Sequence, residues 1–370
     1  MNELKPFREI AQDPYAYADK WKKKTGKKVM GYFCTYTPEE LIAAAGALPF
    51  RIFGTREHIT CADAHLQAYS CSLVRGGLED ALTGRLGFLD GTVFPHTCDS
   101  IQRLSDIWRL NAGFPVHIDI VLPVKLNSPS AHEYLLDVFR KFRRDIEHSL
   151  GPVSDGSLAG SIKLYNRIRG CFADIYRMRS EDPGLISGGD VYAMIKSAMV
   201  MDRNELVDLL DAAVAALKKR GPSGKKFRRI ILAGGVCNQP DIYTLIEKSG
   251  GAVIWDELCT GTRWFEGTVP ETGDPVAALA GRYRDRLVCP AKHSGVEERG
   301  RNLLDIVKKQ RAEGVIFFIL KFCDPHAFDY PYMKEFLDRE KIPSMLLELE
   351  EQIPPEGQLM TRFETFMDLL

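Results

Sequence analysis

The chain has 370 residues, of which 45% are hydrophobic and 27% charged, and its formal net charge is −1. This length exceeds one ordinary hydrophobic core, so we expect a globular protein of two domains, and the near-neutral charge excludes the broad basic surface that nucleic-acid binding requires. The N-terminal MNELKPFREIAQDP lacks the apolar run of a signal peptide and GVIFFIL is too short to span a bilayer, so we expect a cytoplasmic protein with no membrane partner.

The first part of the chain alternates short apolar strands with helices. An amphipathic helix over residues 3–24 comes first, and four predicted strands follow it. Alternation of this kind is typical of βαβ units and a parallel sheet. The strands are predicted at residues 28–33, 50–54, 88–95 and 116–124, and the helices between them at 37–46, 65–84 and 100–111.

The middle of the chain is helical. Residues 131–150 place Leu135, Phe139, Phe142 and Ile146 on one helical face, which predicts a helix packed along that face. Two further helical stretches follow, and then the linker GPSGKK. The stretches lie at 157–180 and 190–220, and the linker at 221–226.

The strand and helix alternation then restarts. Four more strands are predicted at 228–237, 252–259, 314–323 and 343–350, with helices at 241–250 and about 301–311. Because the order matches that of the first part, we predict an α/β fold with an internal pseudo-repeat. Two doubly wound, Rossmann- or flavodoxin-like domains, at 1–129 and 223–370, are joined by a helical connection at 130–222.

Cysteines stand at the ends of several predicted strands. The carboxyl ends of parallel strands meet at one edge of a sheet, where ligands bind and helix N-termini point. A helix N-terminus favours the thiolate, the form that binds metal. Five cysteines, Cys34, Cys98, Cys237, Cys259 and Cys323, directly follow predicted strands, and Cys71 lies in the helical segment between the second and third strands.

The cysteine spacing excludes several familiar sites. None of the nine cysteines forms a CxxC pair, which argues against a zinc ribbon, a thioredoxin motif or a bacterial ferredoxin. A single cysteine at a strand end is as easily a buried core residue as a functional one. Five cysteines at the same topological position favour a functional role, such as metal binding. We interpret Cys171 as packing and place Cys289 in a loop, and Cys61 stays undecided.

Other residues near these cysteines have plainer interpretations. His96 and His326 flank Cys98 and Cys323 and are candidate proton donors, although a hydrogen-bonded structural role is the simpler interpretation for both. Asp99 and Asp324 are expected to cap the helices that follow. No GxGxxG after a strand and no GxxxxGK[ST] occurs, so the chain shows no dinucleotide or ATP motif of its own.

Six segments together resemble the 2-hydroxyacyl-CoA dehydratase family, which includes ATP-dependent benzoyl-CoA reductase subunits and double-cubane cluster proteins. They are GYFCTYTPEELIAAAG, DAHLQAYSCSLVRGGLEDAL, FPHTCD, GGVCNQPDIY, DELCTGTRWF and LKFCDPHAFDYPYMKEFL. The resemblance covers nearly the whole chain. It implies an iron–sulfur subunit of a dehydratase or reductase that passes a low-potential electron to an acyl-CoA thioester through a ketyl radical.

The resemblance also implies the cofactor and its ligands. In the family, three cysteines per subunit hold a [4Fe-4S] cluster with one iron left open, and by motif these fall on Cys71, Cys98 and Cys323. Adding Cys34, Cys237 and Cys259 would give the six thiolates of a double-cubane [8Fe-9S] cluster, which stays open as an alternative. Thr35 is then a candidate contact to the substrate, and the amides around Gly234 and Gly235 are candidates for an anionic group.

The implied partners are a homologous second subunit, or a second copy of this chain, and a separate ATP-hydrolysing iron–sulfur activator. Two other functions remain as hypotheses. One is a homodimeric double-cubane protein that reduces small molecules without a CoA site. The other is a non-catalytic electron-transfer module.

Overall fold

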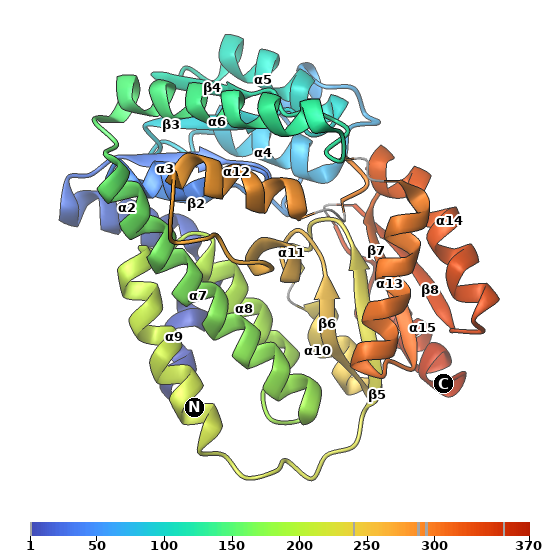
Figure 1. Ribbon diagram of the computed structural model, residues 1–370. Helices are drawn as coiled ribbons and strands as arrows, with labels where there is room; N and C mark the ends of the chain where they lie inside the picture. Colours follow the sequence, from blue (N-terminus) through green and yellow to red (C-terminus); the bar gives the residue numbers. More distant parts are fainter. Residues whose placement is uncertain (1, 240, 287–288, 293–294, 351) are drawn as a thin grey trace.

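Two parallel four-stranded sheets form the centre of the molecule in the computed structural model, which describes residues 2–239, 241–286, 289–292, 295–350 and 352–370 (Figure 1). In the first sheet the strands lie in the order β2-β1-β3-β4, and in the second they lie in the order β6-β5-β7-β8. The predicted α/β fold with two similar domains is therefore confirmed. The strands are β1 (Val29–Tyr32), β2 (Leu48–Arg51), β3 (Gly91–Pro95), β4 (Val116–Ile120), β5 (Arg228–Gly234), β6 (Gly251–Glu257), β7 (Gly314–Leu320) and β8 (Ser344–Leu349).

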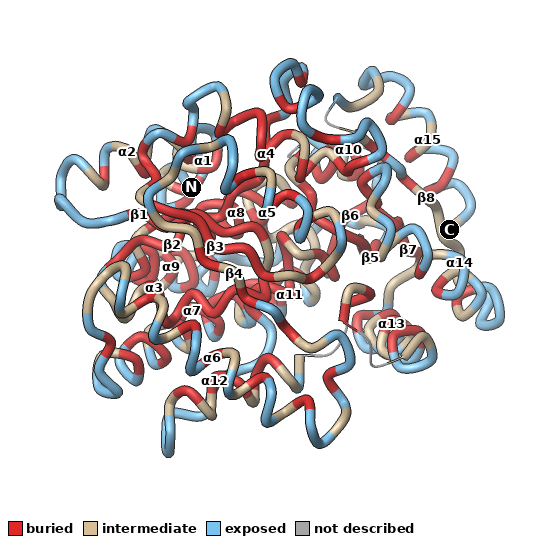
Figure 2. The backbone as a smooth tube through the Cα atoms, turned by 90° about the horizontal axis from the view of Figure 1, so that it is seen from above, coloured by how far each residue is buried: buried red, intermediate tan, exposed pale blue. Residues whose placement is uncertain are grey.

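The strands form here because they are apolar along almost their whole length. Every residue of β1, β2, β3 and β7 is buried, as expected of parallel strands covered on both faces. Figure 2 shows the strands as a buried centre, with exposed residues on the outer faces of the surrounding helices. Because the chain moves to opposite sides of β1 and of β5, each sheet has a topological switch point, between β1 and β3 and between β5 and β7.

Fifteen α-helices and two short 3-10 helices occur within the described residues. The helices of the first part are α1 (Lys5–Gln12), α2 (Pro14–Thr25), α3 (Glu39–Ala44), α4 (Ser72–Leu82) and α5 (Asp99–Asn111). The middle contains α6 (Pro129–Leu150), α7 (Asp155–Glu181), α8 (Gly188–Ala198) and α9 (Arg203–Lys218). The last part contains α10 (Asp241–Lys248), α11 (Thr262–Phe265), α12 (Pro275–Asp285), α13 (Val296–Gln310), α14 (Asp324–Arg339) and α15 (Glu356–Asp368). The 3-10 helices are Asn2–Leu4 and Ala62–Ala64.

Three predicted helices begin or break at different places from those expected. The helix predicted over residues 3–24 is divided, because Pro14 cannot continue α1 and Asp13 instead caps α2 by accepting from the Ala16 amide at 3.0 Å. The helix predicted over 190–220 is also divided, without a proline: α8 ends at Ala198, and Asp202 caps α9 by accepting from the Asn204 and Glu205 amides. The helix predicted over 65–84 begins only at residue 72, because Cys71 is extended.

The four helices of the middle join the two sheets. The predicted apolar face of α6 is buried, and α12 leaves the second sheet to pack against it (Figure 1). The rings of Phe139 on α6 and Tyr283 on α12 lie 5.1 Å apart. Each sheet falls within one of the proposed domains, 1–129 and 223–370, but α12 rests on helices outside its own domain. None of the described helices is long and apolar enough to cross a membrane.

Candidate functional site

The structure places Cys34, Cys98, Cys237, Cys259 and Cys323 within three residues of a strand's carboxyl end. Cys34 and Cys98 follow β1 and β3, the two strands that flank the switch point of the first sheet. Cys237 and Cys323 follow β5 and β7, which flank the switch point of the second. Both crevices in which such folds bind ligands are therefore provided with cysteines.

Three of the cysteines occupy the N-cap position of a helix. Cys71 precedes α4, Cys98 precedes α5 and Cys323 precedes α14, and none of the three side chains makes a capping hydrogen bond. Cysteine is not among the residues preferred at this position, which are Ser, Thr, Asp and Asn. The expected caps Asp99 and Asp324 are instead the first residues inside their helices, because the backbone turns helical only after the cysteine.

The three N-cap thiols lie in one neighbourhood. Burial raises the pKa of Cys323 well above its ordinary value, and the Cys71 and Cys98 thiols raise it further. Burial raises the pKa of Cys98 to about 12, with a smaller contribution from Cys71. Because charges act on one another strongly only at short range in a protein, the fold has gathered Cys71, Cys98 and Cys323 from distant parts of the sequence.

At each N-cap cysteine, a backbone amide opposes the rise in pKa that burial causes. The N–H groups of Val74, Ile101 and His326, each three residues after its cysteine, lower the pKa of Cys71, Cys98 and Cys323 respectively. None of these contacts has the geometry of a full capping hydrogen bond. The three helix N-termini therefore favour negative charge at one place in a buried environment.

A second group of thiols adjoins the first. Burial raises the pKa of Cys289 to about 12, with smaller contributions from Cys259 and Cys34. Burial also raises the pKa of Cys259, and Cys34 again adds to the rise. Cys289 was not predicted to be a site residue, because it follows no strand and lies in an irregular segment after α12. Only its place in the fold brings it near Cys34 and Cys259.

Two buried cations face this second group. Arg263 donates to Glu257 through two nitrogens, at 2.5 and 2.6 Å, and its third nitrogen lies 3.7 Å from the Cys259 sulfur. The ammonium of Lys292 donates to the carbonyls of His96 and Leu122, both at 3.3 Å. Burial lowers the pKa of Lys292, and Cys34 and Cys289 oppose that lowering. Neither cation was predicted as a site residue from the sequence: Arg263 lies in the quoted segment DELCTGTRWF, where only the cysteine was singled out, and Lys292 lies in none of the quoted segments.

Cys237 has different surroundings. Its thiol contacts the Gln239 carbonyl at 3.6 Å, and its amide donates to the Thr260 hydroxyl at 2.9 Å. Burial raises its pKa to about 12, and the charges acting on it come from Asp256 and Lys196. Cys237 is fully buried, and no sulfur of the other cysteines is among its contacts in the described part of the chain.

The three predicted catalytic residues differ in their contacts. They are Thr35, His96 and His326. His96 bonds to Asp119 through Nε2 at 2.9 Å, which matches a structural role. The His326 ring lies 3.7 Å or less from the position of a Cβ on Gly235, and burial holds its pKa well below the ordinary value. The Thr35 carbonyl accepts from Arg286 at 3.1 Å.

The Gly235 amide is not available for an anion, contrary to expectation. It donates to the Phe318 carbonyl at 3.1 Å, while the Gly234 carbonyl accepts from Arg263 at 2.8 Å. Gly234 has a φ of 143°, and a Cβ there would lie 1.8 Å from the Phe318 oxygen. These two glycines therefore allow β5 to approach β7 closely.

A surface groove of about 750 Å³ lies along α12 and the segment that follows α11. Its lining includes Arg282, Arg284 and Arg286, and also the carboxylates Glu266, Asp285 and Glu298. Arg286 also donates to the Thr35 carbonyl, so one lining residue of the groove contacts the residue after Cys34. Its volume is typical of sites for small-molecule ligands, and its arginines suit an anionic one.

The buried carboxyl of Asp256 should make the stability of the protein depend on pH. Its buried carboxylate accepts from Tyr176 at 2.6 Å and Tyr243 at 2.8 Å, and burial raises its pKa to about 6. The folded protein therefore binds this proton more tightly than the unfolded chain, so the stability it contributes is complete below pH ~4 and is lost as the pH rises through about 6. A shift of about two pKa units corresponds to about 3 kcal/mol.

Urea unfolding of metal-free wild type and Asp256→Asn checks this effect. The unfolding free energy of wild type should fall by about 3 kcal/mol relative to the variant between pH 4 and pH 7.5. Asp106→Asn, at an exposed carboxylate 3.2 Å from Arg109, should show no such trend. A pH-independent difference between wild type and Asp256→Asn would show that Asp256 is already ionised at pH 4.

Comparison with known proteins gives matches along nearly the whole chain. A family model described as 2-hydroxyglutaryl-CoA dehydratase, D-component, matches residues 34–370. The chain is 30% identical over 364 residues to a benzoyl-CoA reductase subunit of Thauera aromatica, covering 96% of this chain and 94% of that protein.

Two dehydratase subunits are similar over comparable lengths. The (R)-phenyllactyl-CoA dehydratase beta subunit of Clostridium sporogenes is 28% identical over 365 residues, covering 98% of this chain and 97% of that protein. The (R)-2-hydroxyglutaryl-CoA dehydratase beta subunit of Acidaminococcus fermentans is 24% identical over 376 residues, covering 99% and 98%. All three of these proteins are named as subunits of enzymes.

Proposed function

Because this chain belongs to the 2-hydroxyglutaryl-CoA dehydratase D-component family, we propose that it is an iron–sulfur component of an acyl-CoA dehydratase or reductase. The observation that carries the proposal is the convergence of Cys71, Cys98 and Cys323, each at a helix N-cap with its sulfur free of a capping bond. The names of the relatives support the enzyme class. They include both dehydratases and a reductase, so the choice between the two reactions rests on the substrate.

The donor set fits a four-iron cluster better than a single metal ion. Among the described residues, no three His, Cys, Asp or Glu side chains converge closely enough to hold one ion. A cubane is larger and holds its thiolate ligands further apart, and thiolates are the ligands that such clusters use. Three thiols near one another, with Cys71 buried and Cys98 and Cys323 half-buried, fit a [4Fe-4S] cluster with one iron free of protein ligands. When bound, such a cluster supplies one-electron transfer to an acyl-CoA thioester.

The chain's own residues prepare the place for that charge. The three helix N-termini and their amides stabilise thiolates, which burial alone would disfavour. Arg263 and Lys292 add positive charge beside Cys259 and Cys289. The groove lined by Arg282, Arg284 and Arg286 would receive the anionic part of the acyl-CoA, and the bond from Arg286 to the Thr35 carbonyl would connect that part to the residue after Cys34.

The surroundings of Cys237 favour three ligands over six. A double-cubane [8Fe-9S] cluster needs three further thiolates, and Cys34 and Cys259 lie near one another, but Cys237 faces Asp256 and Lys196. Cys34, Cys259 and Cys289 line the approach to the proposed cluster. The double-cubane protein that reduces small molecules remains the second candidate, because these three thiols are also close together.

Iron content separates these candidates. Anaerobically purified protein should contain about four iron and about four sulfide per chain, because three thiolates hold one cubane. About eight iron per chain would show the double cluster instead. Folded protein without iron after anaerobic reconstitution would contradict both candidates.

Turnover tests the enzyme proposal against an electron-transfer module. We expect dehydration or reduction of an acyl-CoA only when a second subunit and an ATP-hydrolysing activator are present. The relatives are named as single subunits of larger enzymes, which supports a partner for this chain. Nine free cysteines suit the reducing conditions of the cytoplasm. Iron-loaded protein that exchanges electrons but converts no thioester in a broad panel would favour the non-catalytic module.

A further inference from the structure

Arg51 is a buried cation with unsatisfied donors. It is the last residue of β2 and is 1% exposed, and its Nε and Nη1 atoms have no hydrogen-bond partner. Its backbone amide donates to the Met199 carbonyl at 3.0 Å, which fixes the residue at the strand end. A guanidinium that is removed from water without an anionic partner is strongly unfavourable, so this arrangement needs an explanation.

Of the six other buried arginines in the described part of the chain, five have carboxylate partners, and Arg282 donates to three backbone carbonyls instead. The pairs are Arg169–Glu40, Arg179–Glu247, Arg203–Glu39, Arg263–Glu257 and Arg299–Asp329. None of the ion pairs formed by the described residues includes Arg51. Its guanidinium carbon lies 5.6 Å from the centre of the Tyr32 ring, a contact that leaves its positive charge uncompensated.

The carboxylate bonded to Tyr32, that of Glu39, is already fully used. Tyr32 donates to Glu39 at 2.7 Å, and Glu39 also accepts from Trp264, Tyr165 and Arg203. Four donors occupy its two oxygens. Glu39 therefore has no free lone pair directed at Arg51, and the missing anion must come from elsewhere.

Arg51 lies on the side of the sheet where the cysteines gather. It ends β2, and the adjacent β1 ends just before Cys34. The positive charge of Arg51 lowers the pKa of Cys259, and Cys259 in turn acts on Cys323. The unpaired guanidinium is thus within electrostatic reach of Cys259, a thiol that the proposed function places on the approach to the cluster.

We propose that Arg51 is a positioning residue whose charge holds the negatively charged iron–sulfur cluster and raises its reduction potential. The inference rests on the proposed function, since it needs a cluster among these cysteines. Reduction adds one electron to an already anionic group, so a nearby buried cation stabilises the reduced form more than the oxidised one. The charge of Arg51 could also pair with the carbonyl oxygen of a bound substrate. The experiment separates these two sources of negative charge, the cluster and the substrate.

The test compares Arg51→Met, Arg51→Gln and Arg51→Lys with Arg228→Met. Arg228 begins β5, at the opposite end of the strands from the cysteines, and its exposed side chain pairs with Glu313 at 2.9 Å. The midpoint potential of the substrate-free cluster is measured by anaerobic redox titration with electron paramagnetic resonance. The Met and Gln variants should shift to more negative potential, Lys should retain most of the wild-type value, and Arg228→Met should match wild type.

A second readout needs no activity. Arg51→Met should raise or preserve the melting temperature of the metal-free protein, because an unpaired buried charge is removed, and should reduce the increase in melting temperature on anaerobic reconstitution. Loss of iron from a folded Arg51→Met, with iron retained in Arg228→Met, also supports the inference. If Arg51→Met is insoluble, the comparison of Arg51→Gln with Arg51→Lys decides whether the inference holds.

Three outcomes would overturn the inference in different ways. Full iron content with unchanged potential in the Met and Gln variants refutes the role of Arg51 and leaves the proposed function standing. Unchanged potential with a raised KM for the acyl-CoA assigns the charge to the substrate oxygen instead. Wild type without a cluster removes the proposed function and this inference together.

Discussion

Cys98→Ala and Cys323→Ala should each lose the iron and reduce turnover by on the order of 100-fold or more. Replacing even an outer partner of a metal ligand reduces metal affinity or activity about 10- to 100-fold, and a ligand has a larger effect. The two cysteines are 225 residues apart in sequence and cap α5 and α14. Loss of iron from either single variant would therefore show that one cluster bridges the two sheets.

Two other cysteines provide matched controls. Cys171→Ala removes a buried thiol in the middle of α7 that contacts Asp211 at 3.4 Å, away from the proposed cluster. It should keep the iron. Cys237→Ala should also keep it if three thiolates hold the cluster, and should lose part of it if six do. Wild-type iron content in Cys98→Ala or Cys323→Ala, measured with sulfide in folded protein, would remove the basis of the proposed function.

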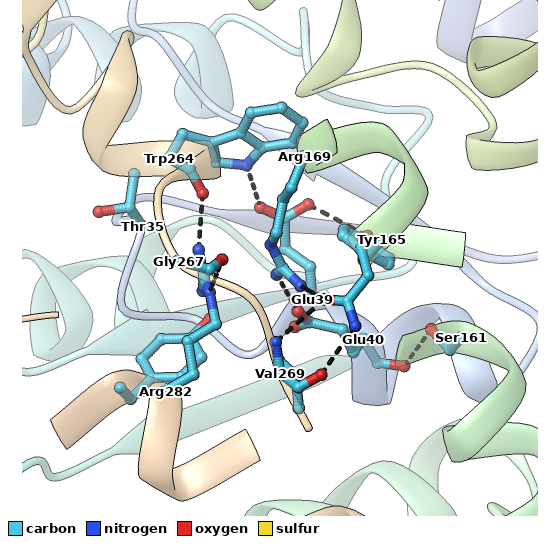
Figure 3. Close-up of polar contacts among 12 residues, drawn as sticks. Thr35, Glu39, Glu40, Ser161, Tyr165, Arg169, Trp264, Gly267, Val269 and Arg282 are labelled. Atoms are coloured by element: carbon cyan, nitrogen blue, oxygen red, sulfur yellow. Dashed lines mark hydrogen bonds and ion pairs between the residues drawn. The ribbon is translucent and has the colours of Figure 1, made fainter. Parts of the chain in front are cut away.

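Glu39→Gln should destabilise the protein by about 3–5 kcal/mol, because it leaves Arg203 as a buried charge without its carboxylate. Glu39 accepts from Arg203 at 2.6 Å, from Tyr32 and Trp264 at 2.7 Å and from Tyr165 at 3.2 Å. Figure 3 shows its carboxylate between Trp264 and Tyr165. These donors come from β1, α7, α9 and α11, so a single carboxylate connects both halves of the chain.

Urea unfolding of the metal-free protein measures this effect. Glu9→Gln is the control, since the Glu9–Lys5 pair is exposed on both sides and spans 3.6 Å. Exposed pairs contribute about 0–1 kcal/mol, so this variant should unfold as wild type does. A Glu39→Gln variant as stable as the control would mean that the remaining donors can accommodate a neutral amide.

Local sequence patterns predicted the eight strands and the apolar face of α6, because short apolar runs mark the strands and apolar residues recur at helical spacing along α6. Helix ends were harder to predict. A cysteine replaced the usual polar cap at α4, α5 and α14, and Asp99 and Asp324 therefore fell one residue inside their helices. Cys71 follows no strand, and only the family resemblance singled it out.

The rest of the site depends on contacts across the chain that no local pattern records. Lys292 donates to the carbonyl of His96, 196 residues earlier, and Arg51 and Cys289 belong to no motif of known spacing. The strand-end rule grouped Cys237 with Cys34 and Cys259, because it predicts the sheet edge at which a residue lies. It does not predict the direction of the side chain, and the sulfur of Cys237 turns toward Gln239.

The most direct measurement of the central claim is anomalous diffraction at the iron absorption edge from anaerobically grown crystals. The proposal predicts one compact iron site per chain, bonded to the sulfurs of Cys71, Cys98 and Cys323, with Arg263 and Lys292 nearby. Iron bonded to other residues, or no iron signal in crystals of folded, reconstituted protein, would contradict it.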